Sequence, residues 1–154
     1  MLATSHALAA GVILKTVPDP RISLPLAFAS HFLLDLIPHW DFITDRGNHN
    51  NSSTLAGEKD RLKLTFLAGG DVLLGVGLTI WLFQSLNPSL LFLTIIFAQL
   101  PDWLEMPYYF WGLNFAPSIW AKKFQRKIHS RLPLPWGLLT QVAIIFPLVW
   151  WAIK

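Results

Sequence analysis

The sequence predicts an all-α protein, a polytopic membrane bundle of about five helices formed by residues 1–154 as a single domain. Hydrophobic residues make up 53% of the chain and charged residues only 14%, whereas a soluble domain carries about 25% charged residues. The mean hydropathy is +0.46, so lipid is the expected solvent. The alternative is an unusually apolar soluble helical protein, whose surface this chain has too little charge to cover.

Several apolar segments approach the roughly 20 residues that a helix needs to cross a membrane. Four of them are predicted to span it, at residues 22–40, 64–83, 88–111 and 132–153. The last has no charged residue at all. The first apolar segment, residues 1–14, either spans the membrane or forms a shorter helix embedded beside the second.

The polar connections at residues 41–63 and 112–131 are predicted to be cytoplasmic loops. Basic residues concentrate on the cytoplasmic side of membrane proteins, and an external turn near Asn87 places nine of them inside and three outside. The prediction is a multi-pass protein of the inner membrane, with its N-terminus in the cytoplasm and its C-terminus outside. The inside set is Arg46, Lys59, Arg61, Lys63, Lys122, Lys123, Arg126, Lys127 and Arg131, and the outside set is Lys15, Arg21 and Lys154.

Composition also excludes some classes of function. The chain has no cysteine, so disulfides and thiolate metal ligands are excluded. Its basic residues are not interleaved with aromatic residues, so no nucleic-acid partner is expected. Four glycines in the third segment are typical of close helix packing; they are Gly69, Gly70, Gly75 and Gly77.

The segment at residues 29–41 places histidines and aspartates in an apolar stretch. His31 and Asp35 are four residues apart, so they share one face of a helix. Pro38 is expected to end or kink that helix, which frees His39 and Asp41 to turn back over the site. Ionisable groups within membrane segments are costly and usually functional.

The predicted topology gathers the other unusual polar residues in the same half of the membrane. His6 lies near the cytoplasmic end of the first segment, and Asp71 lies roughly 12 Å into the third. Asp102 and Glu105 are three residues apart near the cytoplasmic end of the fourth, and His129 precedes the fifth. This distribution predicts one pocket at the inner leaflet.

Imidazole and carboxylate donors suit zinc, and also manganese or iron. Three or four such ligands with one open position allow a metal to acidify a bound water. A remaining carboxylate would orient that water or act as general base, and Asp71 and Glu105 are the candidates. His39 and Asp41 are candidates for the surrounding shell.

Each of these residues also has a structural alternative. His31 and Asp35 would form an internal ion pair, and Asp71 would accept hydrogen bonds from serine or threonine or pair with a lysine. Asp102 would cap a helix. His6, His39, Asp41, Glu105 and His129 would be interfacial or solvated.

Four short motifs resemble small bacterial integral-membrane proteins grouped as metal-dependent hydrolases, which include the LexA-binding, inner-membrane-associated hydrolases and look distantly similar to zinc phospholipase C. They are Thr-Ser-His-Ala-Leu-Ala-Ala-Gly at 4–11, Ser-His-Phe-Leu-Leu-Asp at 30–35, Leu-Pro-Asp at 100–102 and His-Ser at 129–130. Many members carry a further histidine shortly before the His-Ser pair, where this chain has Gln125 and Lys127. The resemblance implies a metal site formed by His6, His31, Asp35, Asp102 and His129.

The sequence therefore favours a membrane-embedded hydrolase that uses a divalent metal, most readily zinc, to cleave a phosphoester or other ester. A membrane lipid or lipid-linked molecule at the cytoplasmic interface is the expected substrate. The alternative is a non-enzymatic membrane protein that handles metal or protons or binds a partner. Charged residues are absent from the fifth segment and from the outer halves of the third and fourth, which favours a closed site over a transport pathway.

Overall fold

The computed structural model describes residues 1–40, 58–111 and 115–154, and their regular elements are all helices. The all-α prediction is therefore confirmed for this part of the chain. The helices are α1 (Ala3–Thr16), α2 (Pro20–Asp35), α3 (Glu58–Leu82), α4 (Pro88–Trp111), α5 (Ala116–Ile128) and α6 (Trp136–Ile153).

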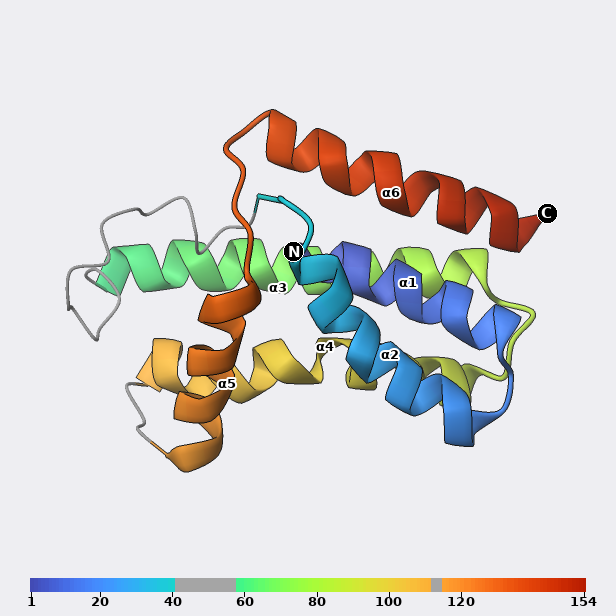
Figure 1. The fold of residues 1–154 in the computed structure, drawn as a ribbon, viewed down its shortest axis with the longest axis horizontal. Helices are drawn as coiled ribbons and strands as arrows, with labels where there is room; N and C mark the ends of the chain where they lie inside the picture. The colour runs from blue at the N-terminus through green and yellow to red at the C-terminus, as the bar shows by residue number, and fades with distance from the viewer. Residues whose placement is uncertain (41–57, 112–114) are drawn as a thin grey trace.

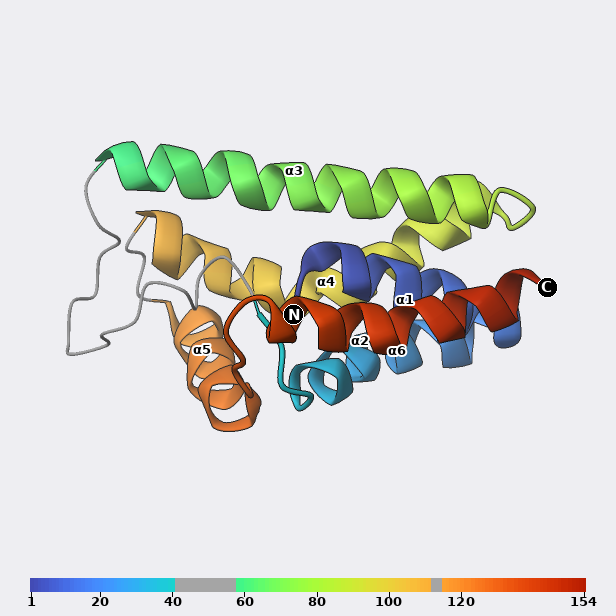
Figure 2. The ribbon, with the colours of Figure 1, turned by 90° about the horizontal axis from the view of Figure 1, so that it is seen from above.

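Helix α1 is the central element, because it packs against α2, α3, α4 and α6. Figure 1 shows that the α1–α2 connection, the α3–α4 connection and the C-terminus lie at one end of the bundle. Seen from above, α3 extends along one side for the whole length of the molecule, whereas α1 and α2 reach only from that end to its middle (Figure 2). The N-terminus of α1 therefore lies in the interior of the bundle.

Within the described residues three helices, and not the predicted four, are long and apolar enough to cross a membrane, at Thr65–Leu82, Pro88–Pro107 and Trp136–Ile153. The prediction of a span at residues 22–40 is wrong. Helix α2 has 16 residues, which corresponds to about 24 Å and falls short of the roughly 30 Å hydrocarbon core. It ends at Asp35, before Pro38, and the following residues leave the helical path.

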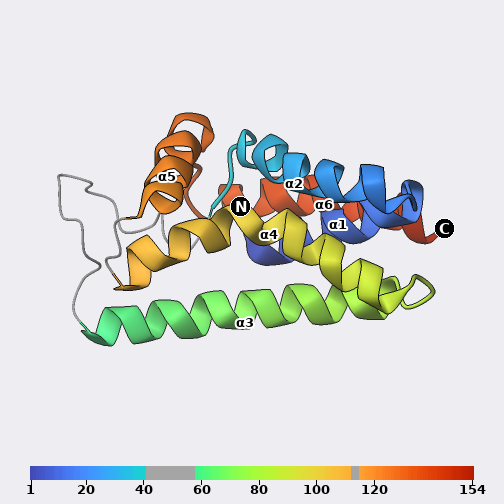
Figure 3. The same cartoon turned by 90° about the horizontal axis from the view of Figure 1, so that it is seen from below.

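Helix α5 corrects the prediction that residues 112–131 form a loop. Ser118, Ala121 and Gln125 lie three or four residues apart and are buried, whereas Lys123 and Lys127 are exposed. This spacing defines an amphipathic helix. The high number of basic residues suggested a cytoplasmic loop, whereas their helical spacing indicates a helix. Figure 3 shows α5 crossing the direction of α3 at a steep angle beside the end of α4.

Only one of the four α3 glycines is in close helix packing. A β-carbon on Gly75 would lie 2.6 Å from the Cα atom of Thr4, so α1 approaches α3 more closely than alanine would allow. Gly69, Gly70 and Gly77 have no such neighbour within 4 Å, and for these three the packing prediction is wrong. The helical period explains the difference, because only one face of α3 meets α1.

The two glycines at positions 75 and 77 provide a matched test of this contact. Gly75→Ala is expected to destabilise the protein by about 1–3 kcal/mol, because the added methyl group overpacks the helix interface. Gly77→Ala is expected to be neutral or stabilising by up to about 1 kcal/mol, since alanine is the better helix former. Thermal unfolding of both variants in detergent measures the difference. Equal effects at the two positions would contradict the α1–α3 packing.

Candidate metal centre

Asp35 lies at the centre of the candidate site. It is the last residue of α2, its side chain is only 1% exposed, and its backbone carbonyl accepts a hydrogen bond of 3.1 Å from the Ser130 amide. The amino group of Met1 lies 2.5 Å from its Oδ1 atom. Four imidazole rings surround this carboxylate at longer distances.

His31 lies one turn earlier on α2 and is fully buried. Its Nδ1 atom is 2.8 Å from the carbonyl oxygen of Ala98, so this nitrogen carries the proton and donates. Its Nε2 atom then lies 3.4 Å from Asp35 Oδ2 and 3.3 Å from Asp102 Oδ1. Metal-binding histidines usually have this arrangement, with one nitrogen donating to a carbonyl and the other facing the metal.

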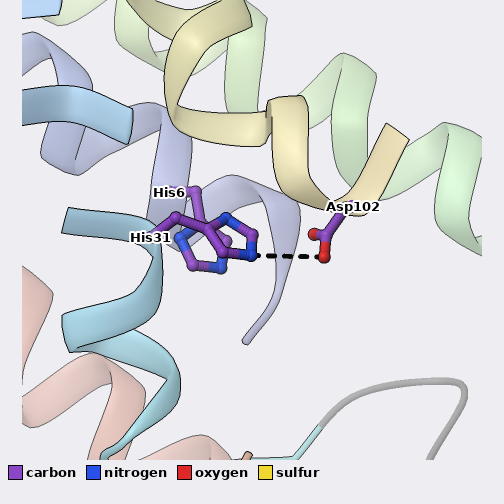
Figure 4. A group of neighbouring side chains, drawn as sticks. All are labelled: His6, His31 and Asp102. Atoms are coloured by element: carbon purple, nitrogen blue, oxygen red, sulfur yellow. Dashed lines mark ion pairs between the residues drawn. The ribbon is translucent and has the colours of Figure 1, made fainter. Parts of the chain in front are cut away.

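His6 reaches the same place from α1. Its ring stacks on that of His31 with 4.1 Å between centroids, and its Nε2 atom lies 3.5 Å from Asp35 Oδ1. Figure 4 shows the two rings one above the other, with the Asp102 carboxylate of α4 facing the edge of His31. Among the described residues neither buried nitrogen of His6 has a hydrogen-bond partner. Such a ring is suited to receive a ligand that supplies the missing contact.

His39 and His129 are brought together by backbone hydrogen bonds between the segments that follow α2 and α5. The His39 amide donates to the Ser130 carbonyl at 3.2 Å, and the Leu132 amide donates to the His39 carbonyl at 2.9 Å. As a result the two imidazole centroids lie 4.4 Å apart. The predicted return of His39 over the site thus takes place through pairing with the chain beyond α5.

Both rings are directed at Asp35. His39 Nδ1 donates to the Ile37 carbonyl at 2.7 Å, which leaves its Nε2 atom facing Asp35 Oδ1 at 3.7 Å. His129 Nδ1 lies 3.8 Å from Asp35 Oδ2. The tautomer of His39 therefore resembles that of His31.

These side chains form two groups that could hold a metal ion. The first donor group is His6, His31 and Asp102, and the second donor group is Asp35, His39 and His129; within each group one donor atom per residue lies within 4.8 Å of the others. Two donors bound tetrahedrally to one zinc ion at about 2.1 Å are roughly 3.4 Å apart. The separations of 3.3–3.8 Å around Asp35 and His31 are close to that value and exceed the roughly 2.7–2.9 Å of a charge-assisted hydrogen bond.

The protonation of the first donor group follows from burial and charge. His6 and His31 lie on α1 and α2, outside the three candidate spans. Burial, reinforced by the charge of His31, lowers the pKa of His6 to about 4. Burial also lowers the pKa of His31, but attraction to Asp102 and Asp35 outweighs it and raises that pKa to about 10. Without a metal, the two carboxylates thus attract a positive charge to the position between them.

Asp71 has a different place from the one predicted for a catalytic carboxylate. Its Oδ2 atom accepts a hydrogen bond of 2.6 Å from the Ala3 amide, and its Oδ1 atom accepts bonds of 3.3 and 2.6 Å from the amide and hydroxyl of Thr4. It therefore caps the N-terminus of α1 from a neighbouring helix, where amides lack intrahelical partners. This is the hydrogen-bonding alternative that the sequence left open, and it anchors the helix that carries His6.

Two further residues were predicted for the site, Glu105 and Asp41. Glu105 is buried on α4, one turn beyond Asp102, and it belongs to neither donor group. Asp41 lies outside the described residues. The structure thus brings His6, His31, Asp35, Asp102 and His129 together, with His39 in addition.

Two glutamines that the sequence analysis did not propose as site residues contribute to the site. Gln125 on α5 is buried, and its Nε2 atom lies 3.5 Å from both His31 Nε2 and Asp102 Oδ1. Gln141 on α6 accepts a bond of 3.0 Å from the Leu2 amide and donates one of 2.7 Å to the Trp40 carbonyl. An amide within an otherwise uncharged span is a signal that could have found Gln141.

Gln125 is expected to support the metal ligands without binding the metal itself. Gln125→Ala is expected to weaken zinc affinity by about tenfold, because partners of the ligands typically contribute 10–100-fold. Competition with a fluorescent chelator would measure the affinity, with Lys127→Ala on the exposed side of α5 as the control. An unchanged dissociation constant would contradict this role.

The chain matches no protein-family model, no curated protein and no solved structure. The case for a function therefore rests on the site itself.

Proposed function

We propose that the protein is a membrane-embedded metal-dependent hydrolase whose metal, preferably zinc, is held by His6, His31, Asp102 and Asp35. The observation that carries the proposal is the convergence of these donors from three helices at the spacing of metal ligands. The hydrogen bond from His31 to Ala98 adds support, because it orients the ring so that Nε2 faces the site.

A metal bound at these donors would acidify water and polarise a phosphoryl or carbonyl oxygen. The chain's own residues would admit the substrate and move the proton. The Asp102 side chain is 36% exposed, so the site is accessible from this residue. Glu105, one turn further along α4, is the carboxylate that we propose as general base. Asp71 is not proposed for that role, since it caps α1.

A lipid or lipid-linked phosphoester or other ester is the substrate class that we favour. Helix α5 lies beside the site and exposes Trp120 and Phe124 together with Lys123, a combination typical of helices that lie in the membrane interface. Trp103, next to Asp102, is also exposed. An apolar chain would therefore find apolar contacts beside the opening of the site.

We further propose that the site faces the cytoplasm from the inner membrane. Lys15, Arg21 and Lys154 flank the α1–α2 connection and the C-terminus, which share one end of the bundle (Figure 1). The lysines of α5 lie toward the other end, where the basic residues are more numerous. The positive-inside rule then assigns the end with α5 to the cytoplasm.

The proposal is tested by metal analysis of the full chain, purified in detergent without a histidine tag. Wild type is expected to contain zinc, or to bind it after stripping, whereas the double variant His31→Ala with Asp35→Ala is expected to contain none. Asp19→Asn is the control, because Asp19 is an exposed carboxylate at the opposite end of the bundle that accepts a hydrogen bond from the Arg21 amide. Wild type without metal, or a double variant with unchanged content, would refute the proposal.

Turnover is tested separately with a panel of phosphoesters and carboxylic esters in mixed micelles. Metal-dependent cleavage of at least one substrate, lost in the double variant, is expected. A protein that binds metal but cleaves nothing in the panel would favour the alternative of a non-enzymatic metal-binding membrane protein. The near-complete burial of the Asp35 side chain is the observation that favours this alternative.

A further inference from the structure

We infer that the centre holds two metal ions, one in each donor group, with Asp35 as the carboxylate that bridges them. This inference rests on the proposed metal binding and extends it from one ion to two. The same residue that completes the first donor group also belongs to the second. The rings of the second donor group also face that carboxylate, at 3.7 Å for His39 and 3.8 Å for His129.

The first argument is the position of Asp35 between two imidazole pairs. Its Oδ1 atom lies 3.5 Å from His6 and 3.7 Å from His39. Its Oδ2 atom lies 3.4 Å from His31 and 3.8 Å from His129. Each oxygen thus faces one ring of each pair, so this carboxylate is within reach of both donor groups.

The second argument is that direct hydrogen bonds to the four rings do not account for these distances, since the direct contact to this carboxylate within the described residues comes from the Met1 amino group. A carboxylate that bonds directly to an imidazole N–H lies about 2.7–2.9 Å from it, and none of the four rings is that close. His31 and His39 have each committed Nδ1 to a backbone carbonyl. Their Nε2 atoms therefore both face Asp35, at 3.4 and 3.7 Å, where a cation between ring and carboxylate would contact both.

The third argument is that the two donor groups supply ligands and negative charge for two ions. With Asp35 the first donor group has four donors, and the second has three within the described part of the chain. Two divalent ions in the close pairing of a two-metal site repel each other, but a shared carboxylate lies between them and Asp102 adds a second negative charge. The ion with more protein donors is expected to bind more tightly, so the two should load in sequence.

Stoichiometry and spin coupling together test the inference on the full chain in detergent. Titration of the stripped protein with zinc is expected to give two equivalents of different affinity. His39→Gln with His129→Gln is expected to lose only the weaker equivalent, and Asp35→Asn is expected to weaken both. Asp19→Asn is the matched carboxylate control and is expected to retain two. Size-exclusion chromatography and helical circular dichroism confirm that each variant is folded.

Manganese provides a measurement that distinguishes two bridged ions from two separate sites. Electron paramagnetic resonance of the protein loaded with two equivalents of Mn²⁺ is expected to show coupled spins, and the His39→Gln, His129→Gln variant is expected to show an isolated ion. One equivalent in wild type, or two without coupling, would overturn the bridged pair and leave the proposed function standing. No bound metal at all would overturn both.

Discussion

Zinc added to the metal-stripped protein is expected to stabilise it by about 4 kcal/mol when free zinc exceeds its dissociation constant a thousandfold. The reason is that four imidazoles and the carboxylate of Asp35 are gathered in the interior, a costly arrangement that a cation relieves. Thermal unfolding in detergent, followed by tryptophan fluorescence with and without zinc, measures the effect.

The control for this effect is the double variant His31→Ala with Asp35→Ala, which is expected to melt at the same temperature with and without zinc. Magnesium provides a second control, since it prefers an octahedral shell of oxygen ligands and retains its waters. A zinc shift of equal size in wild type and in the double variant would show that the ion binds elsewhere.

Asp71→Ala is expected to destabilise the protein by about 3 kcal/mol. The variant removes the acceptor for the amides of Ala3 and Thr4 and for the Thr4 hydroxyl, and each hydrogen bond to a charged group contributes about 1.5–3 kcal/mol. The losses do not add fully, because water or a neighbouring group takes over part of them. Zinc affinity is expected to fall as well, since His6 follows directly on the helix turn that Asp71 anchors.

Asp71→Asn distinguishes this capping role from a catalytic one. An asparagine oxygen still accepts from the α1 amides, although the favourable charge at the helix N-terminus is lost, so a smaller loss of about 1 kcal/mol is expected. Chemical unfolding in detergent compares the two variants. Unchanged stability and metal content together with lost turnover would return Asp71 to the catalytic role predicted from the sequence.

The membership of the site could be predicted to a large extent from the sequence, because membrane segments rarely contain ionisable groups. The four-residue spacing of His31 and Asp35 placed them on one face of α2, and the structure brings His6, Asp102 and His129 to that face. Pro38 ends the helix as expected. The arrangement into two groups around Asp35 could not be predicted, because it depends on backbone pairing between His39 and residues far along the chain.

Other features were not visible in the sequence because they depend on the neighbouring helix. In the sequence Asp71 is a charged residue in an apolar segment, as a catalytic acid would be, but in the structure it pairs with the N-terminus of α1. The glycines of α3 look alike in sequence, and only Gly75 meets another backbone. The length of α2 follows from the return of its C-terminal segment toward Ser130, which an apolar count over residues 22–40 does not register.

The contribution of both His6 and His129 to one centre has a consequence for biogenesis. His6 lies on α1, whereas His129 follows α5, so a ribosome must synthesise both helices and the chain between them before the last ligand exists. Until then Asp35 and His31 lack His129 as a neighbour. If the proposed metal binds, metallation would be the final step of maturation, and a cell starved of the metal would accumulate incomplete protein.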